Sequence, residues 1–581
     1  MRSLVAVLSL LAASACLAQP GLQYRVEIDA PKEIGELLRK GLNLKRWEGD
    51  RQMTPEQLRR LSEEAVREAR ETAATEGYFS ARVQVQFDEG IQPWIVLLTV
   101  DLGERTQVGD IDLRFSGPAV DDPQSAAIFK RVRDTWPLRR GQPFRQADWD
   151  AAKRRATREL ATWRYAAARI TESRALVDPE TRRASLFVEL ASGPAFRFGE
   201  IRVSGVKRYT DELVQNLAPF SPGDVYDRDK LVIYQRKLLE SGYVVSVQAD
   251  VDPQEGRPEA APVRVAVIEA PKHHVEAGVG YSTDSGPRVE LRYSNQDLLG
   301  SAWRFRSALR LDDKIKSQRF DFDSPPTPGA RWNNFFALAR EQDIQNQNTR
   351  EIATGMAHNW GPELTPSSLI LSGHIEQQRF IGDAGELVDD HAHALYLGHR
   401  RTYRRTDDFV SPRQGYMAMF EVGGAPSALS SQNFLRGIIS GSFFLPVGRR
   451  DDLLVRAQAG RVLAENRTGI PSTFLFRTGG DQTVRGYAFE SLGVRQGEAI
   501  VGGRRMFVAS TEYTHWVGEN WGVAGFVDAG QAWDDTAVFR AALGYGVGGR
   551  LRTPIGPIRA DLAYGQLTHQ FRLHFSVGFT F

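Results

Sequence analysis

Paired histidines, Ser-Gly pairs and a glycine run are the residues whose types and spacing could support chemistry. His273-His274 and His391-Ala392-His393 could bind a metal, but no acidic or cysteine partner stands at a ligand spacing. Ser440-Gly441 falls within a strand-like segment and lacks the strand–turn–helix context of a nucleophile. Gly544-Tyr545-Gly546 precedes no helical pattern, so it is not a phosphate loop. We therefore expect no metal, no cofactor and no enzymatic activity.

An Arg-Gly-Tyr triplet is the remaining candidate. Arg485-Gly486-Tyr487 lies in a turn-rich segment, residues 464–504, that has no strand pattern of its own. A connection of this length is usually functional or disordered. Gly486 permits a backbone conformation or a close approach that is closed to other residues. The elements around this loop must explain why it carries an arginine.

Composition places the chain among exported, multi-domain proteins. The 581 residues carry a formal net charge of +2, and this balance argues against a nucleic-acid binder, which normally has a basic stripe. Residues 1–18 match a signal peptide, with a positive start, a short apolar segment and cleavage expected between Ala18 and Gln19. A lipoprotein cut just before Cys16 is the alternative. Either way, we expect an exported chain without disulfides.

Residues 23–271 repeat one pattern three times: a strand, two helices and two further strands. Gly77-Tyr78 and Gly242-Tyr243 follow the second helix of the first and third units, whereas the second unit has Arg164-Tyr165 there. Thr54-Pro55-Glu56-Gln57 predicts a helix start, because Thr54 can cap and Gln57 can complete a capping box. Each unit is expected to have its own core. The sequence predicts three βααββ modules, at residues 23–104, 105–193 and 194–271.

The segment from 272 to 581 shows alternating apolar and polar residues in place of the helical pattern. We count sixteen such segments, each long enough to cross a bilayer when tilted. An even number of strands suits a bacterial outer-membrane barrel, and a soluble sandwich is the alternative. The predicted fold class is α+β modules followed by an all-β, 16-stranded transmembrane barrel.

Four motifs stand in order after the three modules. They are Asp-Phe-Val-Ser-Pro-Arg-Gln-Gly at 408–415, the Arg485-Gly486-Tyr487 triplet, Phe-Val-Asp-Ala-Gly-Gln-Ala-Trp at 526–533, and a glycine-rich stretch at 544–561. Together they resemble the BamA/TamA superfamily of outer-membrane insertases and two-partner secretion pores, which is D15-like (bacterial surface antigen). The three modules are similar to the POTRA domains of that superfamily. The resemblance covers nearly the whole chain after the signal peptide.

The resemblance implies a role for the long loop. It implies that residues 464–504 fold back into the barrel and that Arg485 pairs with Asp528 on the barrel wall. Gly486 and Tyr487 belong to the same contact, and we call Arg485, Gly486, Tyr487 and Asp528 the loop latch. An aspartate facing lipid would destabilise the barrel, which favours an inward-facing Asp528.

The number of POTRA modules suggests a branch of the superfamily. Three modules resemble the TamA branch, the outer-membrane subunit of the translocation and assembly module, rather than the BamA branch with five. This resemblance implies a TamB-like periplasm-spanning partner, unfolded outer-membrane protein and autotransporter clients, and contact with outer-membrane lipid. It also implies a bacterial outer-membrane location with the POTRA domains in the periplasm. The alternative is a two-partner secretion-type pore that exports a dedicated protein, although residues 19–23 are too short for the plug helix of such pores.

A lateral seam between the first and last barrel strands is the expected mechanism. Gly278 and Gly280 in the first strand weaken pairing and packing there. A client strand could add to the exposed edge, whereas a client-free barrel must close because unpaired backbone is costly in lipid. The last strand contributes four aromatic residues to this seam: Phe571, Phe575, Phe579 and Phe581.

Overall fold

The protein is described by a computed structural model. It describes residues 22–577 except 51, 179, 253–256, 363, 409–410, 449, 536–538 and 554–555. The expected cleavage site at Ala18 and Gln19 lies outside the described residues, as do Phe579, Phe581 and two positions of the 408–415 motif. None of the helices in the described ranges is long and apolar enough to span a membrane.

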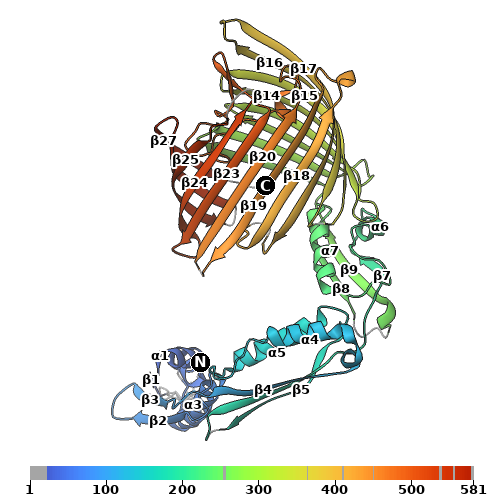
Figure 1. Ribbon diagram of the computed structural model, residues 1–581. Coiled ribbons are helices and arrows are strands. Elements are labelled where there is room, and N and C mark those ends of the chain that lie inside the picture. Colours follow the sequence, from blue (N-terminus) through green and yellow to red (C-terminus); the bar gives the residue numbers. More distant parts are fainter. Residues whose placement is uncertain are drawn as a thin grey trace, which may run out of the picture. The chain divides into compact units, whose positions relative to one another are not determined.

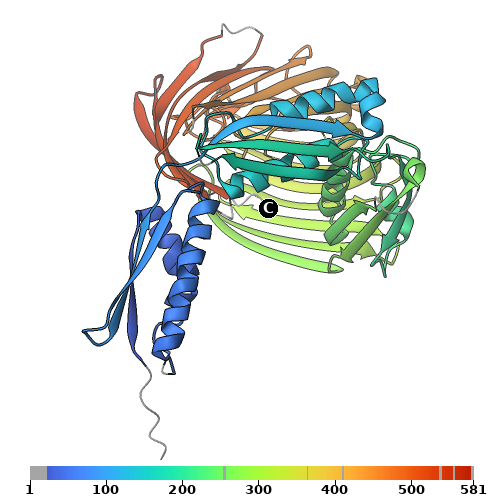
Figure 2. The same ribbon diagram turned by 90° about the horizontal axis from the view of Figure 1, so that it is seen from below.

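The first module is a three-stranded sheet covered on one face by helices. Its strand order is β1-β3-β2, with β1 parallel to β3, and Figure 2 shows the long helix α3 (dark blue) along the sheet. The Thr54 capping box is confirmed: Gln57 N donates to Thr54 Oγ1 at 3.2 Å, and Thr54 N donates to Gln57 Oε1 at 2.9 Å. The elements are β1 (Tyr24–Asp29), α1 (Lys32–Gly41), α2 (Asn43–Arg46), α3 (Pro55–Thr75), β2 (Arg82–Asp88) and β3 (Trp94–Asp101).

The second and third modules repeat this arrangement, with strand orders β4-β6-β5 and β7-β9-β8. The second contains β4 (Gln107–Ser116), η1 (Pro118–Asp121), η2 (Pro123–Ser125), α4 (Ala126–Asp134), α5 (Gln146–Ala161), β5 (Arg169–Asp178) and β6 (Arg183–Ala191). The third contains β7 (Phe198–Ser204), α6 (Asp211–Gln215), α7 (Arg228–Glu240), β8 (Val244–Val251), η3 (Pro258–Ala260) and β9 (Ala261–Glu269).

The turn after the last helix of each module contains a residue with a left-handed backbone in all three modules. Gly77 and Gly242 have φ angles of 94° and 75°, in the left-handed region that favours glycine. Arg164 takes the equivalent place in the second module with φ 64°, although it carries a side chain. Its guanidinium contacts the Asp122 carboxylate at 2.9 Å. The module therefore keeps the turn and gains an ion pair.

The barrel confirms the predicted fold class. Sixteen strands form one closed, antiparallel barrel, coloured green to red in Figure 1. They are β10 (His273–Ser282), β11 (Gly286–Leu298), β12 (Trp303–Asp312), β13 (Ile315–Asp323), β14 (Trp332–Ile344), β15 (Gln347–Trp360), β16 (Ser367–Ile381), β17 (Leu387–Thr406), β18 (Gly415–Ala425), β19 (Phe434–Val447), β20 (Asp451–Leu463), β23 (Arg505–Trp516), β24 (Trp521–Trp533), β25 (Ala542–Thr553), β26 (Gly556–Gly565) and β27 (Gln570–Val577).

Candidate functional site

The loop between β20 and β23 folds into the barrel. It contains the 3-10 helix η5 (Ser472–Phe474) and a short hairpin of β21 (Val494–Gln496) and β22 (Ala499–Val501), which the sequence did not predict. Loop side chains such as Phe474 and Val484 are buried in one cluster with barrel-wall residues such as Tyr396 and Val508. The loop thus supplies the apolar core of the lumen, and these buried loop residues hold it in place.

The alternation along β24 shows which face of the wall the loop contacts. Ala524, Phe526 and Asp528 are buried, whereas the neighbouring Val523 and Val527 are 50% and 55% exposed. Exposed valines on a barrel strand suit a lipid-facing surface, and the buried alternate residues face the lumen. Asp528 therefore points toward the loop.

Arg485 and Asp528 form a two-point ion pair. Arg485 Nε lies 2.7 Å from Asp528 Oδ2, and Arg485 Nη2 lies 2.9 Å from Asp528 Oδ1. The backbone N–H of Arg485 also donates to Asp528 Oδ2, at 3.1 Å. The guanidinium carbon lies 3.4 Å from the centre of the Phe526 ring. Both side chains are buried, with residue exposures of 2% and 0%, so neither charge has water as an alternative partner.

The ion pair belongs to a larger buried network, a role that the sequence did not predict for its other members, although Arg550 and Asp561 stand in the glycine-rich motif at 544–561. Arg485 Nη1 lies 2.6 Å from Glu512 Oε2 and 3.2 Å from Asp561 Oδ2. Arg550 contacts the same two carboxylates, at 2.8 Å from Glu512 Oε2 and 2.5 Å from Asp561 Oδ1. We call Arg485, Glu512, Asp528, Arg550 and Asp561 the latch network. Its residues come from the loop and from β23, β24, β25 and β26, so it ties the loop to four adjacent strands.

The charges of the network favour an ionised arginine. Burial alone would lower the pKa of Arg485, but the hydrogen bonds and charge of Asp528, together with Glu512, raise it above the usual arginine value. A buried ion pair is favourable only where further hydrogen bonds satisfy its remaining atoms, as they do here. The arrangement holds the loop against the barrel wall.

Glycines on both sides allow the loop to approach the wall. Gly486 has a φ of 91°, and a Cβ placed on it would lie 2.7 Å from Gly565 N. A Cβ on Gly544 would lie 1.8 Å from Arg485 O. Gly544, in the glycine-rich stretch, and Gly565 after it therefore leave room for the loop backbone, because a Cβ on either would meet that backbone. Tyr487 adds two bonds at its hydroxyl, donating to Leu543 O at 2.8 Å and accepting from Leu567 N at 3.0 Å.

Replacing Gly486 by alanine is expected to displace the loop. The new Cβ would meet the backbone of Gly565 and Tyr564, which cannot move away as a flexible side chain can. Strain in the left-handed region adds about 1–3 kcal/mol. The thermal unfolding midpoint of the purified barrel in detergent should fall. Gly385→Ala is the matched control, because Gly385 has a φ of 80° and nothing within 4 Å of its Cβ position. Equal losses in the two variants would contradict a close-approach role for Gly486.

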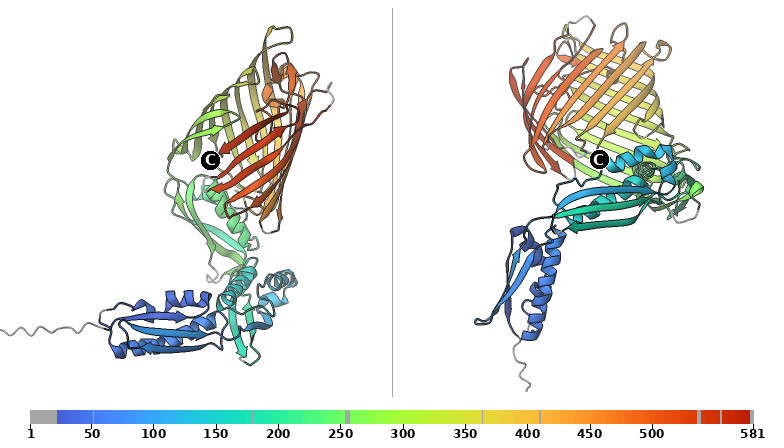
Figure 3. Two further views of the ribbon diagram at one scale, coloured as in Figure 1. Left: turned by 90° about the vertical axis from the view of Figure 1, so that its left-hand side faces the viewer. Right: turned by 60° about the horizontal axis from the view of Figure 1, so that its bottom comes forward.

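The seam between the first and last strands is thinly paired. Across the described residues, β10 and β27 register at a single pair, Ser282–Ser576, whereas β26 and β27 register from Ile558–Val577 to Gly565–Gln570. One further bond crosses the seam, from Phe575 N to Thr283 Oγ1 at 3.2 Å. In the left view of Figure 3 the last strands (dark red) face the first strands (green) along this border.

The predicted seam residues that the structure describes lie on β10 and β27. Gly278 and Gly280 lie in β10 opposite Glu290 and Arg288 of β11. Phe571 is 71% exposed on the outer surface of β27, and Phe575 is half-buried on the same strand. The residue between the outward-facing Leu573 and Phe575 is His574, which is 2% exposed and points inward. No signal in the sequence marked it.

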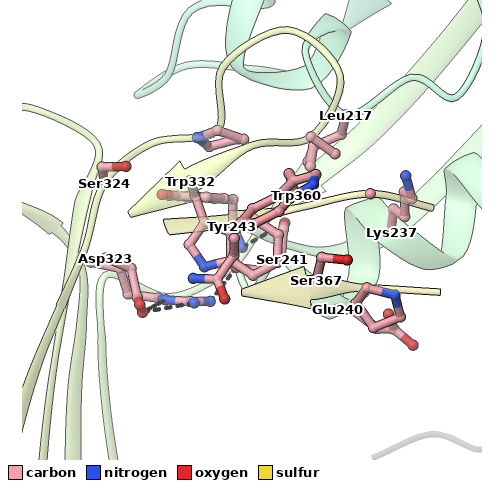
Figure 4. A pocket seen from close by; sticks show the side chains of 16 residues that line it. Leu217, Lys237, Glu240, Ser241, Tyr243, Asp323, Ser324, Trp332, Trp360 and Ser367 are labelled. Carbon is pink, nitrogen blue, oxygen red and sulfur yellow. Dashed lines mark hydrogen bonds and ion pairs between the residues drawn. The ribbon is translucent and has the colours of Figure 1, made fainter. Parts of the chain in front are cut away.

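A hollow lies where the third module meets the barrel (Figure 4). It has a volume of about 320 Å³, and the rings of Tyr243, Trp332 and Trp360 gather at it. Tyr243 donates its hydroxyl to Ala302 O at 2.8 Å, and Arg304 donates to Ser241 O beside its ion pair with Asp323. The Gly-Tyr turn of the third module is therefore a contact with the barrel.

The histidine pairs do not assemble a site. His374 is held by Glu351 at 2.9 Å and is not one of the residues considered from the sequence. His273 contacts Tyr293, and His391 lies 3.5 Å from Asp389. Over the described parts of the chain, no group of three or more His, Cys, Asp or Glu side chains could hold a metal ion.

Comparison with known families matches both halves of the chain. The Omp85 superfamily domain matches residues 273–581, which is the whole barrel. The surface antigen variable number repeat, a POTRA domain, matches residues 196–269, which is the third module. The arrangement of POTRA domain and 16-stranded barrel thus has a known counterpart.

Individual relatives are distant. The outer membrane protein assembly factor BamA of Nitratidesulfovibrio vulgaris is 24% identical over 535 residues, covering 86% of this chain and 66% of that protein. BamA of Neisseria meningitidis serogroup B is 20% identical over 558 residues, covering 84% of this chain and 68% of that protein. The chain spans about two thirds of the length of these relatives. The crystal structure of BamA from Haemophilus ducreyi lacking POTRA domains 1–3 superposes with a TM-score of 0.57 at 14% identity, covering 81% of this chain and 99% of that one.

Proposed function

Because this chain belongs to the Omp85 superfamily, we propose that it is an assembly factor that helps other outer-membrane proteins to fold and insert. The observation that carries the proposal is the seam, where one registered pair joins β10 to β27 over the described residues. An edge that is barely paired can accept a strand from another chain by β-augmentation. The two BamA relatives, both named as assembly factors, support the same function.

The barrel lies in the bacterial outer membrane, and the POTRA domains lie in the periplasm. Outward-facing apolar side chains such as Val279, Ile352 and Ile375, each more than 60% exposed, suit a lipid environment. The third POTRA domain contacts the barrel through Tyr209, whose hydroxyl donates to Gln296 O at 3.1 Å, and through Tyr243. A client arriving from the periplasm would reach the barrel beside the first strand, since β10 follows directly on β9.

The proposed mechanism needs no catalytic residue, cofactor or metal. The seam opens, a client strand pairs with the free edge of β10, and further client strands add until the new barrel can close. Backbone pairing drives each step, because an unpaired N–H or C=O in lipid costs several kcal/mol. Gly278 and Gly280 weaken β10 by offering no side chain for packing. Phe571 and Phe575 on β27 present apolar surface to the lipid beside the opening.

Within the superfamily, we assign the chain to the TamA branch. Three POTRA-like modules support this assignment. Each has one three-stranded sheet, and the last strand of the module lies between the other two in the first, second and third sheets, β1-β3-β2, β4-β6-β5 and β7-β9-β8. The assignment implies a TamB-like periplasm-spanning partner and clients that include autotransporters. Pull-down with the full chain, followed by identification of bound periplasm-spanning proteins, tests it. Recovery of no periplasm-spanning protein would contradict it.

A two-partner secretion-type pore that exports one protein through its lumen is the alternative. The inward loop argues against this function, because Phe474, Val484 and Tyr487 pack into a buried core within the barrel. Export would require that core and the latch network to be dismantled for each passage. Assembly at the seam leaves the loop in place.

Reconstitution tests the proposal. The purified chain is placed in lipid vesicles, an unfolded outer-membrane barrel protein is added, and its folding is followed by heat-modifiable migration on gels. We expect folding to be faster than in empty vesicles and vesicles containing an unrelated porin. If the client folds no faster with this chain, the assembly function is wrong. If a protein substrate instead enters the vesicle lumen, the secretion pore is the better account.

A further inference from the structure

The first hairpin of the barrel is short and its tip is buried. β10 ends at Ser282 and β11 begins at Gly286, so the turn is three residues long. Turn residues Asp284 and Ser285 are only 5% and 7% exposed. Hairpin tips usually project into solvent, and a buried aspartate there requires partners. The tip therefore lies against another part of the chain.

The inward loop holds this tip. The backbone N–H of Asp481 donates to Asp284 Oδ2 at 2.9 Å. Gly480 allows the approach, because a Cβ placed on it would lie 2.6 Å from the same oxygen. Burial and the adjacent Asp284 carboxylate raise the pKa of Asp481, so two separate negative charges are disfavoured here. The contact links the loop to the first side of the seam.

The same loop holds the last strand on the other side of the seam. The backbone N–H of Gly486 donates to His574 Nε2 at 2.9 Å. Because an N–H can only donate, Nε2 must be the acceptor, and the ring proton of neutral His574 sits on Nδ1. Nδ1 faces Asp284 Oδ1 at 3.6 Å, and within the described structure neither atom has a hydrogen-bond partner. Across the seam, the buried imidazole of His574 on β27 thus faces the buried carboxylate of Asp284 in the turn after β10.

We propose that Asp284, Asp481 and His574 form a seam clasp, in which the inward loop holds β10 and β27 together in place of a continuous backbone ladder. Four loop residues, 482–485, separate Asp481, which contacts Asp284, from Gly486, which contacts His574. Arg485 is one of these four residues, so the latch network also positions the clasp. Release of the loop from Asp284 is then the step that frees the first strand. Asp284 and His574 are positioning residues for the opening of the seam.

The clasp explains why the barrel is closed although its end strands barely pair. Only Ser282–Ser576 and the Phe575 N to Thr283 Oγ1 bond join the strands directly in the described residues. Asp561, which lies opposite His574 on β26, is already bound by Arg485 and Arg550. The carboxylate oxygen that faces His574 Nδ1 is Asp284 Oδ1, at 3.6 Å. This inference rests on the proposed function for its purpose, but not for its geometry.

Distance measurement between spin labels tests the clasp in purified, client-free protein. Labels are attached at Val279→Cys in β10 and Phe571→Cys in β27. Both native side chains are exposed on the outer surface of the barrel, whereas the clasp residues Asp284 and His574 are buried. Cys16 is the chain's only native cysteine. Asp284→Ala is expected to raise the ratio of separated to closed molecules by about tenfold, the effect of losing one hydrogen bond to a charged group.

Asp383→Ala is the matched control. Asp383 lies in the β16–β17 turn and accepts the N–H of Gly497 at 2.7 Å, so it holds the same loop to a hairpin remote from the seam. This variant is expected to leave the distance distribution unchanged. Asp284→Asn keeps a carbonyl acceptor for Asp481 N–H and should restore most of the closed population. Should Asp284→Ala fail to fold, His574→Ala and the rescuing His574→Gln provide the same comparison.

The outcomes separate the clasp from the proposed function. An unchanged distribution in Asp284→Ala, or an equal change in Asp383→Ala, would overturn the clasp and leave assembly activity standing. Loss of closure with rescue by Asp284→Asn would support the clasp even if the protein failed to speed client folding in vesicles. Failure of the asparagine variant to restore closure would show that Asp284 acts only through its charge and would contradict the hydrogen-bonded clasp.

Discussion

Replacing Arg485 by alanine is expected to release the loop from the barrel wall and to lower the free energy of unfolding by about 3–5 kcal/mol. The variant leaves the Asp528 carboxylate fully buried without its two-point partner, while Glu512 and Asp561 keep only Arg550. Of the latch network, three carboxylates and Arg550 would then remain. The thermal midpoint of heat-modifiable migration, together with protease cleavage within residues 464–504, measures the change.

The design of this experiment separates charge from geometry. Arg485→Lys keeps the charge but cannot form the paired bonds to Asp528 Oδ1 and Oδ2, so it should recover only part of the loss. Arg495→Ala removes an exposed arginine of the same loop and should have little effect. A double mutant of Arg485 and Asp528 should lose less than the sum of the single variants, because the two residues are in contact. Strict additivity would contradict the pair.

A disulfide across the seam is expected to abolish client assembly while leaving the barrel folded. Ser282→Cys and Ser576→Cys place cysteines at the registered pair between β10 and β27. Residues directly opposite on antiparallel strands have Cα atoms about 4.5–5.5 Å apart, which a disulfide can bridge. If assembly requires separation of these strands, the oxidised protein should not accelerate client folding, and a reductant should restore it.

A second disulfide supplies the control for locking. Leu562→Cys and Leu573→Cys join β26 and β27, which are already paired along their length. This bond also ends on the last strand but crosses no seam, so assembly should continue at its native rate. Normal activity of the oxidised Ser282–Ser576 variant would refute assembly through this seam, whereas equal loss in both variants would point to a general effect of stiffening β27.

The sequence predicted the architecture because the periodicity is strong and local. Alternation such as that of Phe571 and Leu573 depends only on a strand having one apolar face, and the capping residues Thr54 and Gln57 act within a single turn. Residue 164 was harder to interpret, since an arginine in the left-handed region departs from the glycine found at 77 and 242. The structure shows that the turn is kept despite the change.

The candidate site was predictable only where motifs mark it. Arg485 and Asp528 lie in motifs that resemble those of the superfamily, and the structure brings them together. Glu512 and His574 stand in ordinary alternating strands, where a one-residue change of register would turn either side chain to the lipid face. Asp284 is a turn aspartate, a residue type common in turns for local reasons. Their meeting depends on how the barrel closes, which no local pattern specifies.

Cross-linking of a client to β10 tests the central claim most directly. An unfolded outer-membrane barrel protein with one cysteine in its last strand is added to the chain carrying Ser282→Cys at the seam, or Ala353→Cys, which is buried on the lumen side of β15. Assembly at the seam predicts a mixed disulfide with Ser282→Cys that forms during client folding and none with Ala353→Cys. Cross-linking through the lumen position alone would contradict it and favour export through the barrel.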